Sequence, residues 1–203
     1  STRFKIVDVL TNQADAEKAN EELRSRMMKA DSLAMEKQKV LDEATIKDYL
    51  AKNNIKAERT PEGTYVEVTN QGTGPKVEPG KAVSVLYKGM LLGGKIFDES
   101  YDSTGAPKDP FTFVVGAPGA IEGWSDGMVY FNEGGSGRLF IPSARAYGSR
   151  GAGQDIAPNT PIMFEVTITK VQNQDEYQKE MAARQKKLEE EHQKQLKEQQ
   201  QKK

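Results

Sequence analysis

The chain has 203 residues, one histidine, no cysteine and a formal net charge of -1. The length allows one domain with extensions or two small domains, and the near-zero net charge favours neither nucleic acid nor an anionic membrane. The absence of cysteine excludes disulfides, thiolate catalysis and cysteine-ligated zinc. The single histidine, His192, excludes a histidine-rich metal site and argues against a Ser-His or Cys-His hydrolase. We therefore expect no metal site built on cysteine or histidine.

The composition divides the chain into three regions. The middle is rich in glycine, proline, aromatic and β-branched residues, whereas both ends are rich in Lys, Glu, Gln and Ala. This contrast predicts a β-rich globular core with helical arms. We expect an N-terminal strand and helical extension over 1–60, a core domain over 61–171 and a charged helical tail over 172–203.

The first sixty residues predict a short strand followed by two helical pieces. The run 4–10 has β-like composition, and apolar residues then recur at helical spacing over 14–40 and again over 42–53. Asn53 and Asn54 are expected to end the second piece, because Asn tolerates the left-handed conformation at a helix end.

A turn signal at 60–63 opens the predicted core. The core should contain one short helix over 121–129, a hairpin turn at 92–95 and a long Gly/Pro loop over 148–161, which by its length is functional or mobile. Apolar and β-branched runs predict strands at 65–68, 82–90, 111–115, 138–142 and 162–168.

From Gln174 onward, the sequence predicts a solvated helix with a thin apolar stripe made by Tyr177, Met181 and Leu188. This is at most a weak coiled-coil signal. Basic residues alternate with acidic ones, so a nucleic-acid-binding stripe is not expected. No apolar run approaches the length that crosses a bilayer.

The start of the chain leaves two interpretations open. Val7 and Leu10 fall in register with Ile168 and Val171, and each run precedes a charged helical stretch. The favoured interpretation is coincidence between two strand-to-helix passages, and the other is that 1–13 is the last strand of a preceding, related domain. Because the first residue is Ser1 and not Met, we also expect a processed or trimmed product, which leaves a removed targeting segment open.

One ordered set of aromatic and glycine motifs carries the functional signal. Its large side chains can line one apolar cleft, and nothing nearby resembles a nucleophile, a metal cluster or a phosphate loop. Such a cleft suits a reaction that breaks no covalent bond, and rotation about the peptide bond to proline is such a reaction. The motifs are Tyr87-Lys88-Gly89-Met90-Leu91, Gly94-Lys95-Ile96-Phe97-Asp98, Pro110-Phe111-Thr112-Phe113, Ile121-Glu122-Gly123-Trp124 and Ile141 to Gly148 with its Ala146-Tyr147-Gly148 ending.

In order and spacing, these motifs resemble the FK506-binding-protein (FKBP) class of peptidyl-prolyl isomerases over about residues 70–171. Ile156-Ala157-Pro158 leading to Phe164 completes the match. The resemblance implies an α+β fold, in which a strongly bent antiparallel sheet wraps one short helix, here flanked by N- and C-terminal helical arms. The arms look like those of extended FKBPs from bacterial envelopes. That likeness implies a cell-envelope or periplasmic location, with a lipid anchor on a segment preceding Ser1 as one form of it.

The resemblance also implies the site. Trp124 would form the floor of the pocket, while the Ile121 N–H and the Tyr147 hydroxyl would bind carbonyls of the substrate or inhibitor. The implied catalytic residues are Tyr87, Phe97, Asp98, Trp124, Tyr147 and Phe164, and the implied substrate-binding residues are Phe111, Ala120, Ile121 and Ile156.

Three departures from the family pattern bear on this site. The stretch 99–109 is longer than in the minimal family member and lacks the arginine that usually partners the aspartate, so Asp98 is left with Lys108, Tyr87 or no partner. Ala120 stands where valine is commoner, which should widen the pocket slightly. The loop 149–155 is glycine-rich and lacks bulky residues that often flank the cleft.

Other interpretations remain for single residues. A strand phenylalanine is usually plain core, as we expect of Phe113, and a lone aspartate such as Asp98 is usually a cap or turn residue. Met27, Met28 and Met35 on the N-terminal helix suit adaptable client contacts, but such residues more often pack on a partner helix.

We therefore expect a cofactor-free isomerase that acts on proline-containing unfolded or partly folded polypeptides and binds macrolide inhibitors. A homodimer through the helical arms is one expected assembly. The alternatives are a non-catalytic FKBP-fold chaperone or binding module, and a mainly structural envelope protein whose arms carry the function.

Overall fold

The computed structural model describes residues 13–201. The chain divides into two compact units, one up to Leu41 and one from Asp42 onward. The predicted strand over 4–10 lies outside the described residues, as does most of the 1–13 segment that echoes the end of the core. Helix α1 (Gln13–Lys52) is continuous, so the prediction of two separate helical pieces is wrong. Neither glycine nor proline occurs in this range, so nothing interrupts the backbone hydrogen bonds.

In the first unit, α1 leaves large apolar side chains in solvent. None of the described side chains up to Leu41 is buried within this unit. The large apolar side chains of this unit that are more than half exposed are Leu23, Met27, Met28, Leu33, Met35, Val40 and Leu41.

The second unit begins with the last turns of α1, which pack on the sheet. Ile46 is fully buried and forms a small core cluster with Leu50, Tyr65, Phe140 and Met163. Asn54 has a φ of 53°, so the helix ends in the left-handed conformation that the sequence predicted.

The sheet has seven antiparallel strands in the order β1-β2-β6-β7-β3-β4, with β5 also paired to β3. Strand β3 pairs with β7 along its whole length, with β5 at its start and with β4 at its end. The strands are β1 (Glu58–Arg59), β2 (Tyr65–Asn70), β3 (Ala82–Leu91), β4 (Ile96–Glu99), β5 (Phe111–Val114), β6 (Ser136–Ile141) and β7 (Ile162–Gln172). The sequence located all of these except the short strands β1 and β4.

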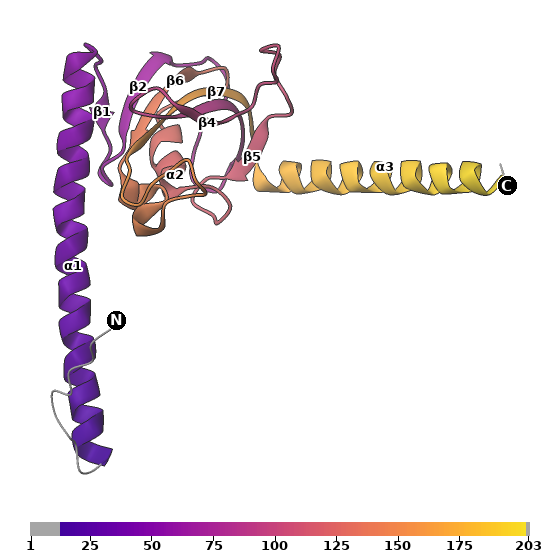
Figure 1. The fold of residues 1–203 in the computed structure, drawn as a ribbon. Helices are drawn as coiled ribbons and strands as arrows, with labels where there is room; N and C mark the ends of the chain where they lie inside the picture. Colours follow the sequence, from indigo (N-terminus) through magenta and orange to yellow (C-terminus); the bar gives the residue numbers. More distant parts are fainter. Residues whose placement is uncertain (1–12, 202–203) are drawn as a thin grey trace. The chain divides into compact units, whose positions relative to one another are not determined.

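Helix α2 (Glu122–Met128) lies inside the curve of the sheet (Figure 1). Trp124 and Met128 point into the main core, where they join side chains from β3, β6 and β7. Gly123 and Gly127 let the helix approach β6 closely, because a methyl group at these positions would overlap Ile141 and Leu139. The α+β class, the antiparallel sheet on one short helix and the flanking helices are confirmed.

Two short turns follow β6. The 3-10 turn η1 (Ser143–Arg145) and the 3-10 turn η2 (Gly148–Arg150) start the connection to β7. After β7, helix α3 (Gln174–Gln201) forms the predicted charged tail. Across 13–201, no helix combines the length and apolar character needed to cross a membrane. The expected domain limits at 60 and 171 stay predictions.

Candidate active site

A cavity of about 550 Å³ opens between α2, the sheet and the segment that follows β6. Tyr87 comes from β3, Asp98 from β4, Phe111 from β5 and Phe164 from β7, so four strands and one helix build it. The lining residues are Tyr87, Asp98, Phe111, Gly119, Ala120, Ile121, Glu122, Trp124, Ala144, Ala146, Tyr147 and Phe164.

Trp124 is the centre of the ring cluster. Its ring centroid lies 5.1 Å from that of Tyr87, 5.2 Å from that of Phe164 and 5.6 Å from that of Phe111, all in edge-to-face arrangements. The indole is buried and its N–H has no hydrogen-bond partner among the described residues. The inner wall of the cavity therefore consists of aromatic rings.

Of the two partners that the sequence left open for Asp98, Lys108 and Tyr87, the structure shows Tyr87. The Tyr87 hydroxyl donates a hydrogen bond of 2.7 Å to the Oδ2 atom of Asp98. Burial, followed by this bond to Asp98, raises the pKa of the Tyr87 hydroxyl well above its ordinary value. Tyr87 thus stays protonated at neutral pH and orients the carboxylate at the rim of the cavity.

Besides the buried indole N–H of Trp124, two donors in the cavity remain free for a ligand. Within the described residues, neither the Tyr147 hydroxyl nor the Ile121 N–H has a hydrogen-bond acceptor. Ile121 precedes the first turn of α2 with an extended backbone, at φ -63° and ψ 145°, so its N–H is not used by the helix. Burial and the negative charge of Asp98 raise the pKa of the Tyr147 hydroxyl, which keeps it a donor.

Eight of the ten predicted site residues line this cavity, and the other two, Phe97 and Ile156, are not among its lining residues. The Phe97 ring packs edge-to-face on Phe164 at 5.6 Å, in a space left open by Gly89. Ile156 is buried in the main core and pairs with Ala152 across a short bridge. Their assigned roles in catalysis and substrate binding stay predictions. Phe113 is a buried core residue, as expected.

The sequence did not assign four further lining residues: Gly119, Glu122, Ala144 and Ala146. Each stands beside or within a motif that was recognised, so proximity to Ile121 and Tyr147 was the available signal. Small side chains at 144 and 146 carry no chemistry of their own, and only the path of the backbone brings them to the cavity.

The long Gly/Pro loop is tied to the rest of the domain at its tip. Lys95, in the turn between β3 and β4, forms an ion pair of 2.7 Å with Asp155. Gly151 has a φ of 64°, and an added Cβ would run into the backbone of 156–158. Over the described part of the chain, no group of three or more Asp, Glu or His side chains could hold a metal ion.

Comparison with known proteins identifies the family. The model of FKBP-type peptidyl-prolyl cis-trans isomerases matches residues 74–169. An FK506-binding protein of Neisseria meningitidis serogroup B is 38% identical over 109 residues, which are 96% of that protein and 54% of this chain. The chain belongs to the FKBP-type peptidyl-prolyl cis-trans isomerases.

Three further relatives align over more of this chain than the family model does. A probable FKBP-type peptidyl-prolyl cis-trans isomerase FkpA of Neisseria meningitidis is 33% identical over 76% of this chain, and the match spans 57% of that relative's length. The crystal structure of FkpA from Escherichia coli aligns with a TM-score of 0.55 at 30% identity, over 80% of this chain and 74% of the other. An isomerase from Pseudomonas syringae aligns with a TM-score of 0.54 at 32% identity and covers 66% of this chain.

Proposed function

We propose that the cavity around Trp124 accelerates rotation about X-Pro bonds in unfolded or partly folded polypeptides, without a cofactor. The observation that carries this proposal is the ring cluster: Tyr87, Phe111, Trp124 and Phe164 enclose a space that holds two free hydrogen-bond donors. Membership of the FKBP family supports the reaction class.

The reaction fits an apolar cleft because of the nature of its barrier. Rotation about a peptide bond faces about 18–20 kcal/mol, since the twisted amide loses its resonance. Water stabilises the planar, more dipolar amide through its carbonyl. A wall of aromatic rings withholds that water, so the planar state is destabilised more than the twisted state. The prolyl ring is apolar and would pack on Trp124.

The two free donors would hold the substrate around the rotating bond. The Ile121 N–H and the Tyr147 hydroxyl can each bind a carbonyl next to proline, so that one side of the bond is fixed while the other turns. Asp98 is bound by Tyr87 and keeps the rim polar, and no proton transfer is needed.

The proposal is tested by a protease-free cis-to-trans assay on a set of X-Pro peptides. We expect acceleration by the intact chain and inhibition by FK506. Trp124→Leu should lower kcat/KM by roughly tenfold or more, because much of the aromatic contact surface is lost. Tyr147→Phe should lower it by about three- to tenfold, the equivalent of one neutral hydrogen bond.

Tyr101→Phe is the matched control, since Tyr101 lies outside the cavity, with Lys88 Nζ 5.9 Å from its ring centre. Acceleration that survives Trp124→Leu would place the reaction in a different cleft. A folded chain that accelerates no peptide would instead be a non-catalytic binding module.

We further propose that two copies associate through the helical arms. Along 15–41, α1 exposes seven large apolar side chains, and its acidic and basic residues carry no net charge that would repel a second copy. Sedimentation equilibrium should give a dimer for the whole chain and a monomer after removal of 1–41. A whole chain that stays monomeric would leave the arm as a client-holding surface.

The location that we propose is the bacterial cell envelope, free in the periplasm or held by a lipid anchor. It rests on the likeness of the arms to extended envelope FKBPs, and the lack of cysteine makes the fold independent of the redox state of the compartment. Cell fractionation tests it, and recovery of the protein only in the cytosol would contradict it. Release by osmotic shock, without detergent, would argue against the anchor.

A further inference from the structure

One wall of the cavity is a short segment, 143–147, that no strand holds. It follows β6 and consists of η1, Ala146 and Tyr147. Three of its residues, Ala144, Ala146 and Tyr147, line the cavity, and Tyr147 supplies one of the two free donors. Something other than the sheet must therefore fix its position.

The first anchor of this segment is Asp42, on the last turns of α1. Its Oδ2 atom accepts the Ser143 N–H at 2.7 Å and the Ser143 hydroxyl at 2.6 Å, and both residues are 1% exposed. The residue before the turn is Pro142, which has no side-chain acceptor, so the carboxylate from α1 caps the turn in its place.

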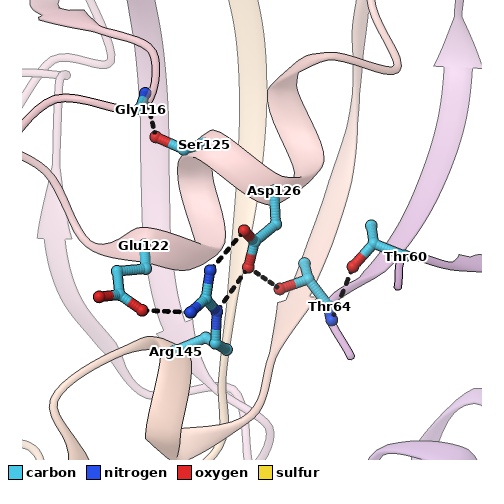
Figure 2. A network of polar contacts seen from close by, with 7 residues as sticks. All are labelled: Thr60, Thr64, Gly116, Glu122, Ser125, Asp126 and Arg145. Atoms are coloured by element: carbon cyan, nitrogen blue, oxygen red, sulfur yellow. Dashed lines mark hydrogen bonds and ion pairs between the residues drawn. The ribbon is translucent and has the colours of Figure 1, made fainter. Parts of the chain in front are cut away.

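The second anchor is Arg145, which joins the segment to α2. Its Nε and Nη2 atoms donate to the two carboxylate oxygens of Asp126 at 2.8 and 2.6 Å, and its Nη1 atom donates to Glu122 (Figure 2). This paired geometry is the one in which an arginine fixes both the distance and the orientation of a carboxylate. Only 7% of the Asp126 side chain is exposed, so solvent screens the pair weakly.

The partner of Arg145 is itself fixed from a third direction. The Thr64 hydroxyl donates to Asp126 at 3.3 Å, while the Thr64 N–H donates to the Thr60 hydroxyl at 3.1 Å (Figure 2). Asp126 therefore cannot easily follow Arg145 if the segment moves. Together, the bonds from Arg145 and Thr64 to Asp126 set the position of 143–147 against α2, which carries Trp124 and follows Ile121.

We propose that Arg145 is a positioning residue for the isomerase cleft: its guanidinium joins 143–147 to α2 and so fixes the Tyr147 hydroxyl relative to the Ile121 N–H. The inference rests on the proposed function of this cleft. Arg145 does not itself line the cavity, so it acts on the substrate through the groups that it holds: the segment 143–147 and the carboxylate of Glu122.

A double-mutant cycle between Arg145→Gln and Tyr147→Phe tests this role by the peptide assay. We expect Arg145→Gln alone to lower kcat/KM by about three- to tenfold, as much as the loss of the Tyr147 hydrogen bond itself. In the Tyr147→Phe background it should have little further effect, because the hydroxyl that Arg145 positions is already absent. Arg145→Lys should recover only part of the loss, since Lys lacks the fork that binds both carboxylate oxygens.

Arg138→Gln is the matched control. Arg138 pairs with the carboxylate of Glu67, as Arg145 pairs with those of Asp126 and Glu122. Its side chain is 30% exposed, against 28% for Arg145, and it lies outside the cleft. Arg138→Gln should lower the thermal stability without lowering kcat/KM. This result would separate the positioning of Tyr147 from a general loss of stability.

An equal loss from Arg145→Gln with and without the Tyr147 hydroxyl would overturn the inference and leave the proposed function standing. A folded wild-type chain without isomerase activity would overturn both. If Arg145→Gln fails to fold, the same cycle is run with Arg145→Lys, which keeps a positive charge beside Asp126, and the same two outcomes decide.

Discussion

At the scale of single residues, the tyrosine hydroxyls of the cleft are set to remain hydrogen-bond donors. Burial comes first among the causes that raise the pKa of both Tyr87 and Tyr147, and the charge of Asp98 adds to it. A free tyrosine titrates near pH 10, so neither hydroxyl ionises at neutral or mildly alkaline pH.

The pH profile of the enzyme should reflect these tyrosines. We expect kcat/KM to show no titration step between about pH 6 and about pH 10, the range below the ordinary tyrosine pKa. The raised pKa in the folded state also means that the stabilisation from these hydroxyls is complete below pH ~10 and is lost as the pH rises further. Peptide assays and alkaline unfolding followed by circular dichroism would check both points. A step in kcat/KM near pH 7 that Tyr147→Phe removes would contradict the first point.

Asp42 should be among the most sensitive polar residues for stability. Asp42→Ala leaves the N–H and hydroxyl of Ser143 buried without an acceptor, which should cost roughly 1–3 kcal/mol of unfolding free energy. Denaturant titration gives the value. Asp48→Ala is the control on the same helix, because Asp48 is 62% exposed and its ion-pair partner among residues 13–201 is the exposed Lys52. Equal effects of the two changes would show that the Ser143 contact does not stabilise the fold.

At the scale of elements, the packing of α2 on β6 depends on two glycines. A methyl group at Gly123 would overlap Ile141, and one at Gly127 would overlap Leu139. Gly123→Ala should therefore destabilise the domain by roughly 1–3 kcal/mol, although alanine favours a free helix. Gly93→Ala, in the turn after β3, meets no atom within 4 Å and serves as the control in thermal unfolding. A more stable Gly123→Ala variant would mean that β6 adapts.

The sequence predicted five of the seven strands, and the two that it missed share a physical reason. Long runs of apolar and β-branched residues located β2, β3, β5, β6 and β7, because each buries a face in the core. Strand β1 has two exposed residues and β4 alternates between exposed and half-buried, so neither carries a hydrophobic pattern. Each is a strand because it pairs with a neighbouring strand, β1 with β2 and β4 with β3. A local sequence pattern does not encode such a pairing.

At the scale of the whole molecule, the contacts of α1 decide where the isomerase domain begins. Ile46 and Leu50 complete a core cluster with residues of β2, β6 and β7, and Asp42 holds the segment after β6. These contacts belong to the unit 42–203. The last turns of α1 are therefore part of the folded domain as well as of the arm.

Two truncations would locate this boundary. A chain that starts at Asp42 should keep the thermal stability of the domain and its activity on short peptides. A chain that starts at residue 61, the limit predicted from composition, should lose stability because Phe140 and Met163 would lose their contacts with Ile46 and Leu50. Equal unfolding temperatures for the two truncations would restore the limit at residue 60.

The sequence by itself determined the family, the α+β class and most of the cleft residues. These follow from motifs whose residue types the fold needs. Examples are Trp124 on the short helix α2, and Phe111 and Phe113 at alternate positions of β5. Only the tertiary structure decided that Phe97 packs on Phe164, that Ile156 lies in the main core, that Tyr87 is the partner of Asp98, and that Asp42 and Arg145 hold the wall carrying Tyr147. The contact between Asp42 and Ser143 joins residues 101 positions apart. Such a bond depends on how the chain is brought together in space, and neither local pattern nor periodicity carries that information.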